Sequence, residues 1–168
     1  MSSPPALRPG GERPLTPGEC DLARGVFGEA LDLAPVRIRR RRFFPFQPRG
    51  TVMAPMGHIH FHPTSEAYCD DFSTAPLGDQ GLFIHELVHV WQSQQHGRFY
   101  LPLMRHPFCR YSYSFDAARP FTAYGIEQQA ELVRHAFLAA QGAPSPLAPP
   151  LAVLANVLPF GVVAEMRA

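Results

Sequence analysis

Two histidines and a glutamate near the middle of the chain have the types and spacing of a metal site. His85, Glu86 and His89 form an HExxH pattern. Four residues of helix advance about 6 Å and turn about 400°, so both histidines project from one face and can bind one zinc ion. Glu86 lies about 100° round the helix, where it can act as a general base on water beside the metal. The pattern predicts a zinc-dependent hydrolytic centre; the alternative is an ordinary helix with two histidines that face water.

Zinc needs a third protein ligand, and the nearest histidine is poorly placed to supply it. His96 follows His85 by three helical turns, too far along the axis to reach the same ion. In the metzincin pattern a glycine breaks the helix, and a histidine ten residues after the first one folds back. Gln92 and Gln95 occupy those two positions here, so the metzincin interpretation is excluded.

A pair of carboxylates further along the chain is the better candidate. Glu127 and Glu131 are four residues apart on a predicted helix, where their like charges repel each other mildly. The pair makes sense if one carboxylate binds the cation and the other orients a metal-bound histidine. Ala130 between them would let two helices approach closely around the ion. The alternative is a solvated helix face whose charge is balanced by Arg134 and His135, and the HExxH pattern favours the ligand.

The elements that must position these residues are predicted in an α+β order. Thr16-Pro17-Gly18-Glu19 has the form of a capping box and begins a helix predicted over 17–32. A small twisted sheet follows, with strands predicted at 36–46, 51–53 and 58–62.

The second half of the predicted domain is helical. Asp79 can cap the HExxH helix, which ends near Gly97, and a long aromatic loop spans 98–120. A last helix over 121–140 carries the candidate third ligand. These elements give a single domain at 16–142, after a flexible Pro-rich leader at 1–15 and before a Pro- and Ala-rich apolar tail at 143–168.

Composition excludes several functional classes. The 168 residues, 46% of them hydrophobic, suffice for one domain with a real core. All fifteen basic residues are arginine, so lysine-dependent phosphate loops, Schiff bases and pyridoxal chemistry are excluded. The net charge of +1 argues against a nucleic-acid partner. Cys20, Cys69 and Cys109 form no CxxC pair, which favours a reducing, cytoplasmic location. The apolar stretch 147–163 is interrupted by proline and glycine and predicts no membrane span.

Two further patterns lie in the predicted sheet. His58, His60 and His62 alternate and would share one face of a strand, as a second metal site, an exposed face, or a cleft edge to which an extended peptide could add. Arg37 and the run 39–42 are interpreted as a solvated strand that discourages edge pairing.

The patterns together resemble known families. HExxH at 85–89 followed by ExxAE at 127–131 is similar to the gluzincin clan of zinc metallopeptidases in a minimal, zincin-like form. The string His85–Gln92 also resembles the HExxHxxQ motif of small zincin-like domains found with contractile injection systems. The segments 44–48, 53–58 and 103–108 resemble bacterial proteins labelled Vgr-related, and that likeness covers residues 14–142.

The gluzincin resemblance implies a role for each site residue. It implies His85, His89 and Glu127 as zinc ligands and Glu86 as the base. Glu131 stands where the clan usually has Asp or Asn, and is one methylene longer.

The clan also uses a Tyr, His or Arg to stabilise the oxyanion. Tyr124, one turn before the third ligand, is one candidate, and His106 and Arg105 are the others.

The implied function is zinc-dependent hydrolysis of peptide or amide bonds in a peptide or protein substrate. The alternative is a non-catalytic, zinc-stabilised adaptor that binds spike or injection machinery. Under either interpretation the protein would be cytoplasmic or exported with that machinery.

Overall fold

The structure is a computed structural model that describes residues 6–105 and 109–160. It confirms the predicted α+β class, with helices and one small sheet. The first part of the predicted leader (1–5), the candidate His106 and the end of the predicted tail (161–168) lie outside the described residues.

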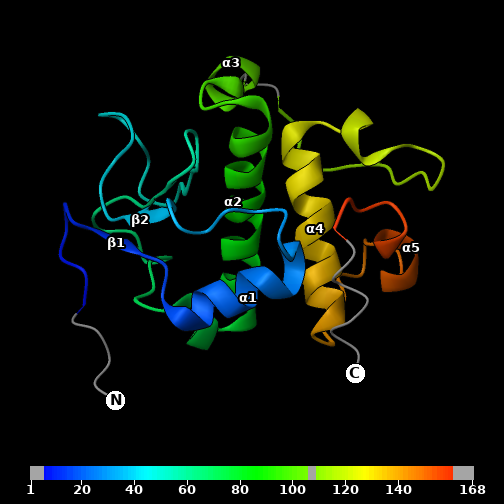
Figure 1. Cartoon of the computed structure of the whole chain (residues 1–168), viewed down its shortest axis with the longest axis horizontal. Coiled ribbons are helices and arrows are strands. Elements are labelled where there is room, and N and C mark those ends of the chain that lie inside the picture. The colour runs from blue at the N-terminus through cyan, green and yellow to red at the C-terminus, as the bar shows by residue number, and fades with distance from the viewer. Residues whose placement is uncertain (1–5, 106–108, 161–168) are drawn as a thin grey trace.

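Two long helices, α2 (Leu77–His96) and α4 (Ile126–Ala140), run side by side through the middle of the molecule (Figure 1). They are antiparallel, since His89 faces Glu127 while His85, one turn earlier, faces Glu131. The small sheet lies on one side of this pair, the C-terminal segment lies on the other, and α1 (Pro17–Phe27) crosses its end (Figure 1).

The sheet has three short strands in the order β1 (Glu12–Pro14), β2 (Arg37–Arg39) and β3 (Ile59–His60). β1 pairs with β2 antiparallel, and β2 pairs with β3 parallel. β1 falls inside the segment that the sequence analysis assigned to a flexible leader. Its pairing shows that the sheet begins before residue 16, because Arg13 opposes the fully buried Ile38.

The strands are shorter than the predicted runs because a buried side chain turns the chain away from the sheet. Gln47 accepts a hydrogen bond from Phe43 N–H and donates to Thr51 C=O, which folds the segment between them into a loop. The predicted strand at 36–46 therefore ends after β2. The predicted strand at 51–53 does not form; this segment makes an isolated β-bridge between Met53 and His60.

Helix α1 begins as predicted and ends earlier than predicted. The Thr16 side chain accepts from Glu19 N–H and the Glu19 carboxylate accepts from Thr16 N–H, which completes the capping box. Glu19 is fully buried and also binds Arg13 at 2.7 Å, so the cap joins β1 to α1. The helix ends at Phe27 because Gly28 has a φ of 55°.

The boundaries of the two long helices also differ from the predictions. Helix α2 begins at Leu77 after Pro76, rather than at a cap on Asp79. A short 3₁₀ helix, Phe121–Ala123, precedes α4, so the last predicted helix is divided in two. The two helices approach closely at Gly81, where a Cβ atom would lie 3.2 Å from Leu138 Cδ2.

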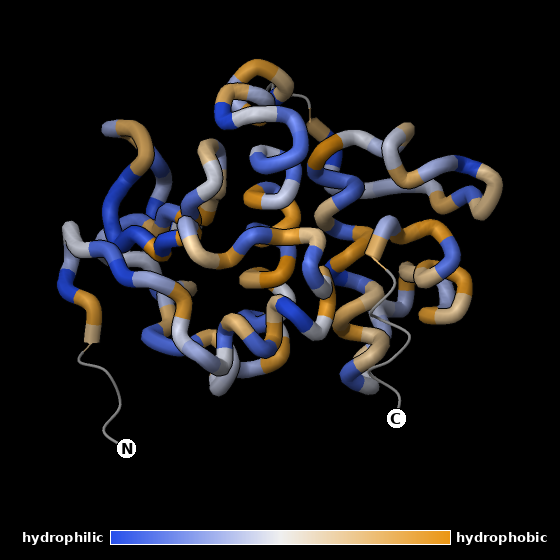
Figure 2. Tube along the Cα trace, viewed as in Figure 1, coloured by the Kyte–Doolittle hydropathy of each residue, from blue (hydrophilic) through white to orange (hydrophobic). Residues whose placement is uncertain are grey.

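Hydrophobic residues recur along the two long helices and the C-terminal segment (Figure 2). Helix α3 (Tyr100–Met104) occupies part of the predicted aromatic loop. Helix α5 (Leu151–Ala155) lies in the predicted tail, and its buried Leu154 joins the core together with Phe160. None of the helices in the described ranges has the length and hydropathy that crossing a membrane requires.

Candidate metal centre

Helices α2 and α4 bring three potential ligands together in the core. His85 and His89 come from α2 and Glu127 comes from the first turn of α4. One ligand atom from each lies within 4.8 Å of the others, and all three side chains are buried. Among the described residues this is the one such group of His, Cys, Asp or Glu side chains. The structure thus places His85, His89 and Glu127 together, as the sequence patterns suggested.

The spacing of these atoms suits a small cation. Glu127 Oε2 lies 3.0 Å from His89 Nε2 and 3.3 Å from His85 Nε2. Ligands bound tetrahedrally at about 2.0–2.1 Å from zinc lie about 3.3 Å from one another. Two imidazoles and one carboxylate are a common protein ligand set for zinc, and they leave a coordination position open. The residues present therefore fit zinc.

The second ring nitrogen of each histidine has its own hydrogen-bond partner. His85 Nδ1 lies 2.7 Å from Glu131 Oε1, and His89 Nδ1 lies 2.8 Å from Gln92 Oε1. Partners of this kind fix the ring orientation of metal-binding histidines. Glu131 is the second carboxylate that the sequence analysis singled out. Gln92 was noted there only as part of a motif, and no role was predicted for it.

The charges around the group favour a cation. Burial lowers the pKa of His85, but the hydrogen bonds that the ring donates to Glu127 and Glu131 outweigh burial and raise the pKa to about 9. Burial raises the pKa of Glu127, but hydrogen bonds from His85 and His89 hold it well below its usual range. The carboxylate of Glu127 is therefore ionised. Its other oxygen, Oε1, lies 3.3 Å from Arg105 Nη2 and accepts no hydrogen bond among the described residues.

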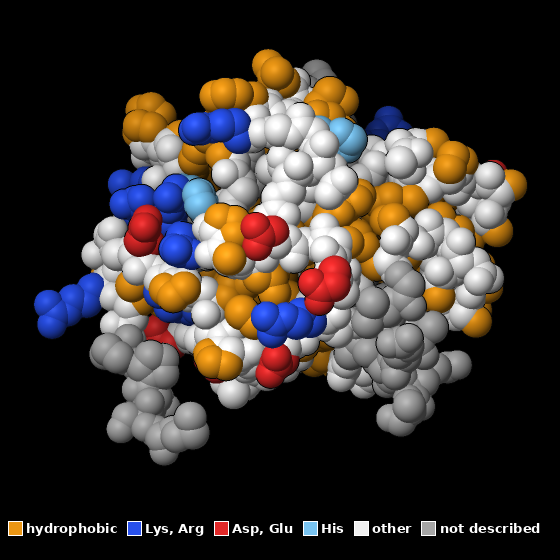
Figure 3. Space-filling model, viewed as in Figure 1, with side chains coloured by type: hydrophobic (Ala, Val, Ile, Leu, Met, Phe, Trp, Pro, Cys, Tyr) orange, Lys and Arg blue, Asp and Glu red, His pale blue; other side chains and the backbone are white. Residues whose placement is uncertain are grey.

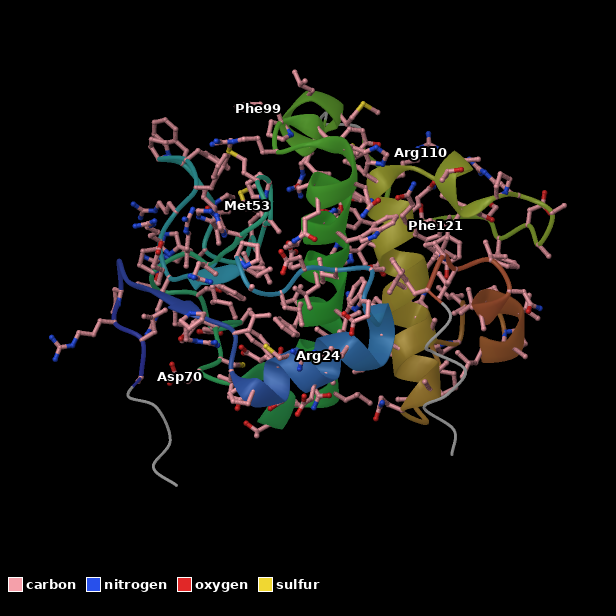
Figure 4. The ribbon with its side chains drawn as sticks, viewed as in Figure 1. Arg24, Met53, Asp70, Phe99, Arg110 and Phe121 are labelled. Atoms are coloured by element: carbon pink, nitrogen blue, oxygen red, sulfur yellow. The ribbon has the colours of Figure 1, made fainter. Side chains whose placement is uncertain are left out.

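Glu86 lies beside the group in a cleft of about 250 Å³. Loop residues 50–52 line one wall, and Tyr111, Glu131 and Arg134 line the other. Figure 4 shows Met53 on the sheet side of α2 and Arg110 near the N-terminal end of α4. The Glu86 side chain is buried, and its Oε2 atom has no hydrogen-bond partner among the described residues. A buried carboxylate oxygen without a partner is costly, which makes Glu86 a candidate functional residue of this cleft.

The structure separates the candidates for oxyanion stabilisation. The Tyr124 hydroxyl accepts from Asp116 N–H and donates to Asp116 C=O, so it is not brought to the metal group. Arg105 does reach the group through Glu127. Tyr111, which the sequence analysis missed, stacks on the His85 ring at a centroid distance of 6.1 Å and lies 3.4 Å from Arg105 Nη2. It occupies an irregular aromatic segment, where no periodicity marks its position.

The alternating histidines of the sheet do not form a second group of this kind. His60 Nδ1 lies 3.3 Å from Arg41 C=O, and His62 Nδ1 accepts from Thr64 N–H. β3 includes only the middle histidine, so the three do not share the face of a continuous strand.

Comparison with known proteins places the chain in a family. None of the protein-family models matches it. Over 133 residues it is 41% identical to the type VI secretion system spike protein VgrG2b of Pseudomonas aeruginosa, a match that covers 75% of this chain and 13% of that protein. The chain therefore spans about an eighth of that spike protein's length.

A solved structure matches most of the fold. It is the effector domain of Pseudomonas aeruginosa VgrG2b, with 34% identity and a TM-score of 0.70. The match covers 90% of this chain and 82% of the solved one. This chain belongs to the family of the VgrG2b effector domain.

Proposed function

We propose that the protein is a zinc-dependent hydrolase of peptide or amide bonds with a zincin-like site. The observation that carries the proposal is the convergence of His85, His89 and Glu127 beside an unpartnered, buried Glu86. Zinc, when bound there, would supply Lewis-acid polarisation of the substrate carbonyl and lower the pKa of water. The adjoining cleft, which loop residues 50–52 and Tyr111 help to line, is where an extended substrate could lie.

The chain's own residues would then move the protons. The Glu86 carboxylate would accept a proton from the attacking water, because Glu86 lines the cleft and its Oε2 atom has no other partner among the described residues. The same carboxylate would pass that proton to the leaving amine. Arg105 and the Tyr111 hydroxyl, which lie 3.4 Å apart, would donate hydrogen bonds to the oxygen on which negative charge develops. Glu131 would hold the His85 ring in place.

Replacing Glu86 tests this proposal directly. Glu86→Gln keeps the size of the side chain and removes the base, so hydrolysis of a peptide library should fall by roughly 10²–10⁴-fold. Zinc content, measured by elemental analysis of untagged protein, should remain near one ion per chain. His85→Ala, as the matched control, should lose both activity and zinc. Undiminished hydrolysis by Glu86→Gln would contradict the assigned role.

The comparisons also support a link to secretion machinery. Because the related domain is part of a spike protein, we propose that this domain is delivered with, or docks on, such a spike. A non-catalytic adaptor with the same zinc group remains the second candidate, favoured by the small volume of the cleft. An adaptor would show spike binding that requires zinc and no hydrolysis that requires Glu86.

A further inference from the structure

The side chain of Gln92 is among the most deeply buried polar groups in the protein. It is 1% exposed and makes hydrogen bonds in two directions. Its Oε1 atom lies 2.8 Å from His89 Nδ1, on its own helix. Its Nε2 atom donates to Ile126 C=O at 3.1 Å and to Gln129 Oε1 at 2.9 Å, both on α4. Both amide protons and the oxygen therefore have partners.

The direction of this amide is set by a backbone carbonyl. Ile126 C=O can only accept, so the nitrogen of Gln92 must face it and the oxygen must face His89. The same reasoning applies one step further along, where Gln129 Nε2 donates to Tyr124 C=O at 2.9 Å. The oxygen of Gln129 must then face Gln92. Two backbone carbonyls thus orient both amides.

The oriented amide dictates where His89 carries its proton. Because Gln92 Oε1 is an acceptor, Nδ1 of His89 must be the donor. When a metal takes the place of the proton shared with Glu127 Oε2, which lies 3.0 Å from Nε2, the ring must be neutral, and Nε2 then offers its lone pair to the metal. The reversed tautomer would place the ring proton where a cation would sit.

The same amides also form hydrogen bonds with the start of α4, the helix that supplies the third ligand. The Gln92 amide donates to the carbonyl of Ile126, the residue before Glu127. The Gln129 amide donates to the carbonyl of Tyr124, which lies just before the helix. Gly125, at the helix start, has no side chain of its own to form a cap. One buried side chain, Gln92, therefore contacts both the second ligand and the segment that positions the third.

We propose that Gln92 and Gln129 are positioning residues for the metal centre, with Gln92 selecting the His89 tautomer and joining His89 to the start of α4. The inference rests on the proposed function, since it assigns these residues to the same zinc site. Gln92 acts on a ligand directly, while Gln129 acts through Gln92. Loss of Gln92 should therefore have the larger effect.

Zinc affinity, measured by competition with a chromophoric chelator, tests the inference without any assay of activity. Gln92→Met keeps the length and removes both polar groups, and affinity should fall roughly 10–100-fold. Gln129→Met should give a smaller loss in the same direction. Gln94→Met is the matched control: Gln94 is on the same helix but binds Asp32 at the surface, and its loss should leave zinc affinity unchanged.

A nuclear magnetic resonance measurement keeps the inference testable if Gln92→Met does not fold. In the zinc-loaded wild-type protein, ¹⁵N correlation spectra should show a protected proton on Nδ1 of His89 and none on Nε2. A proton on Nε2, or unchanged zinc affinity in Gln92→Met, would overturn the inference and leave the proposed function standing. A wild-type protein that takes up no zinc would overturn both.

Discussion

The chain contains two groups of histidines whose sequence spacing suggests a shared face, and only one of them converges. His85 and His89 are four residues apart on α2, and their Nε2 atoms meet at Glu127. His60 ends β3 and His62 lies two residues after it, and each ring binds its own backbone partner. Spacing alone therefore does not distinguish a metal site from structural histidines.

The charges around the two groups differ in sign. His85 contacts two carboxylates, and its pKa is raised to about 9. His60 has no carboxylate partner among the described residues; burial, together with the smaller effects of the charges on Arg39 and Arg41, lowers its pKa to about 4. Figure 3 shows basic side chains gathered over β1 and β2. The nearby acidic residue Glu12 is already bound to Arg39 and Arg41. A cation is attracted to the first group and repelled from the second.

Removing one histidine from each group should give the largest contrast. His89→Ala deletes a ligand, so zinc binding should weaken by at least about a thousandfold. His60→Ala should leave zinc content unchanged, although it opens space in the core and lowers the melting temperature of the protein. Elemental analysis and thermal unfolding of both variants make the comparison. Loss of metal from His60→Ala with folding intact would show that the sheet histidines also bind zinc.

The pH dependence of the zinc-free protein offers a second contrast. The pKa of His85 in the folded protein, about 9, lies above the ordinary value of 6.5. Its contribution is therefore fully present below pH 6.5 and is lost as pH rises through about 9, which amounts to about 3 kcal/mol. Thermal unfolding of chelator-treated protein should show this decline, and zinc-loaded protein should not.

Glu131→Gln is the control for the pH experiment. It removes one of the two carboxylates hydrogen-bonded to His85, which lowers the pKa of His85 in the folded protein, so the decline should be smaller and should end at a lower pH. Stability of the zinc-free wild-type protein that rises between pH 6.5 and 9 would contradict the assigned charges.

The same comparison shows what the sequence could and could not predict. The helical spacing of His85 and His89 is local, so their common face could be predicted without the rest of the fold. The role of Gln92 could not, because its partner Ile126 C=O comes from a distant part of the chain. The short strands were missed for a different reason: they depend on the buried Gln47, whose hydrogen bonds to Phe43 and Thr51 are local but follow no periodic pattern. A long-range hydrogen bond therefore accounts for the first miss and an irregular loop accounts for the second.

Removing positive charge from the sheet side should give the smallest effect. Burial lowers the pKa of His62, and the exposed Arg42 and Arg49 lower it further. The double variant Arg42→Gln and Arg49→Gln should therefore raise that pKa, and only slightly, because exposed charges are screened by water and salt. A histidine titration by nuclear magnetic resonance would measure the shift, with His85 in zinc-loaded protein as the unaffected reference. A fall in the pKa of His62 would mean that the arginines do not set the field there, and the contrast between the two histidine groups would then rest on burial alone.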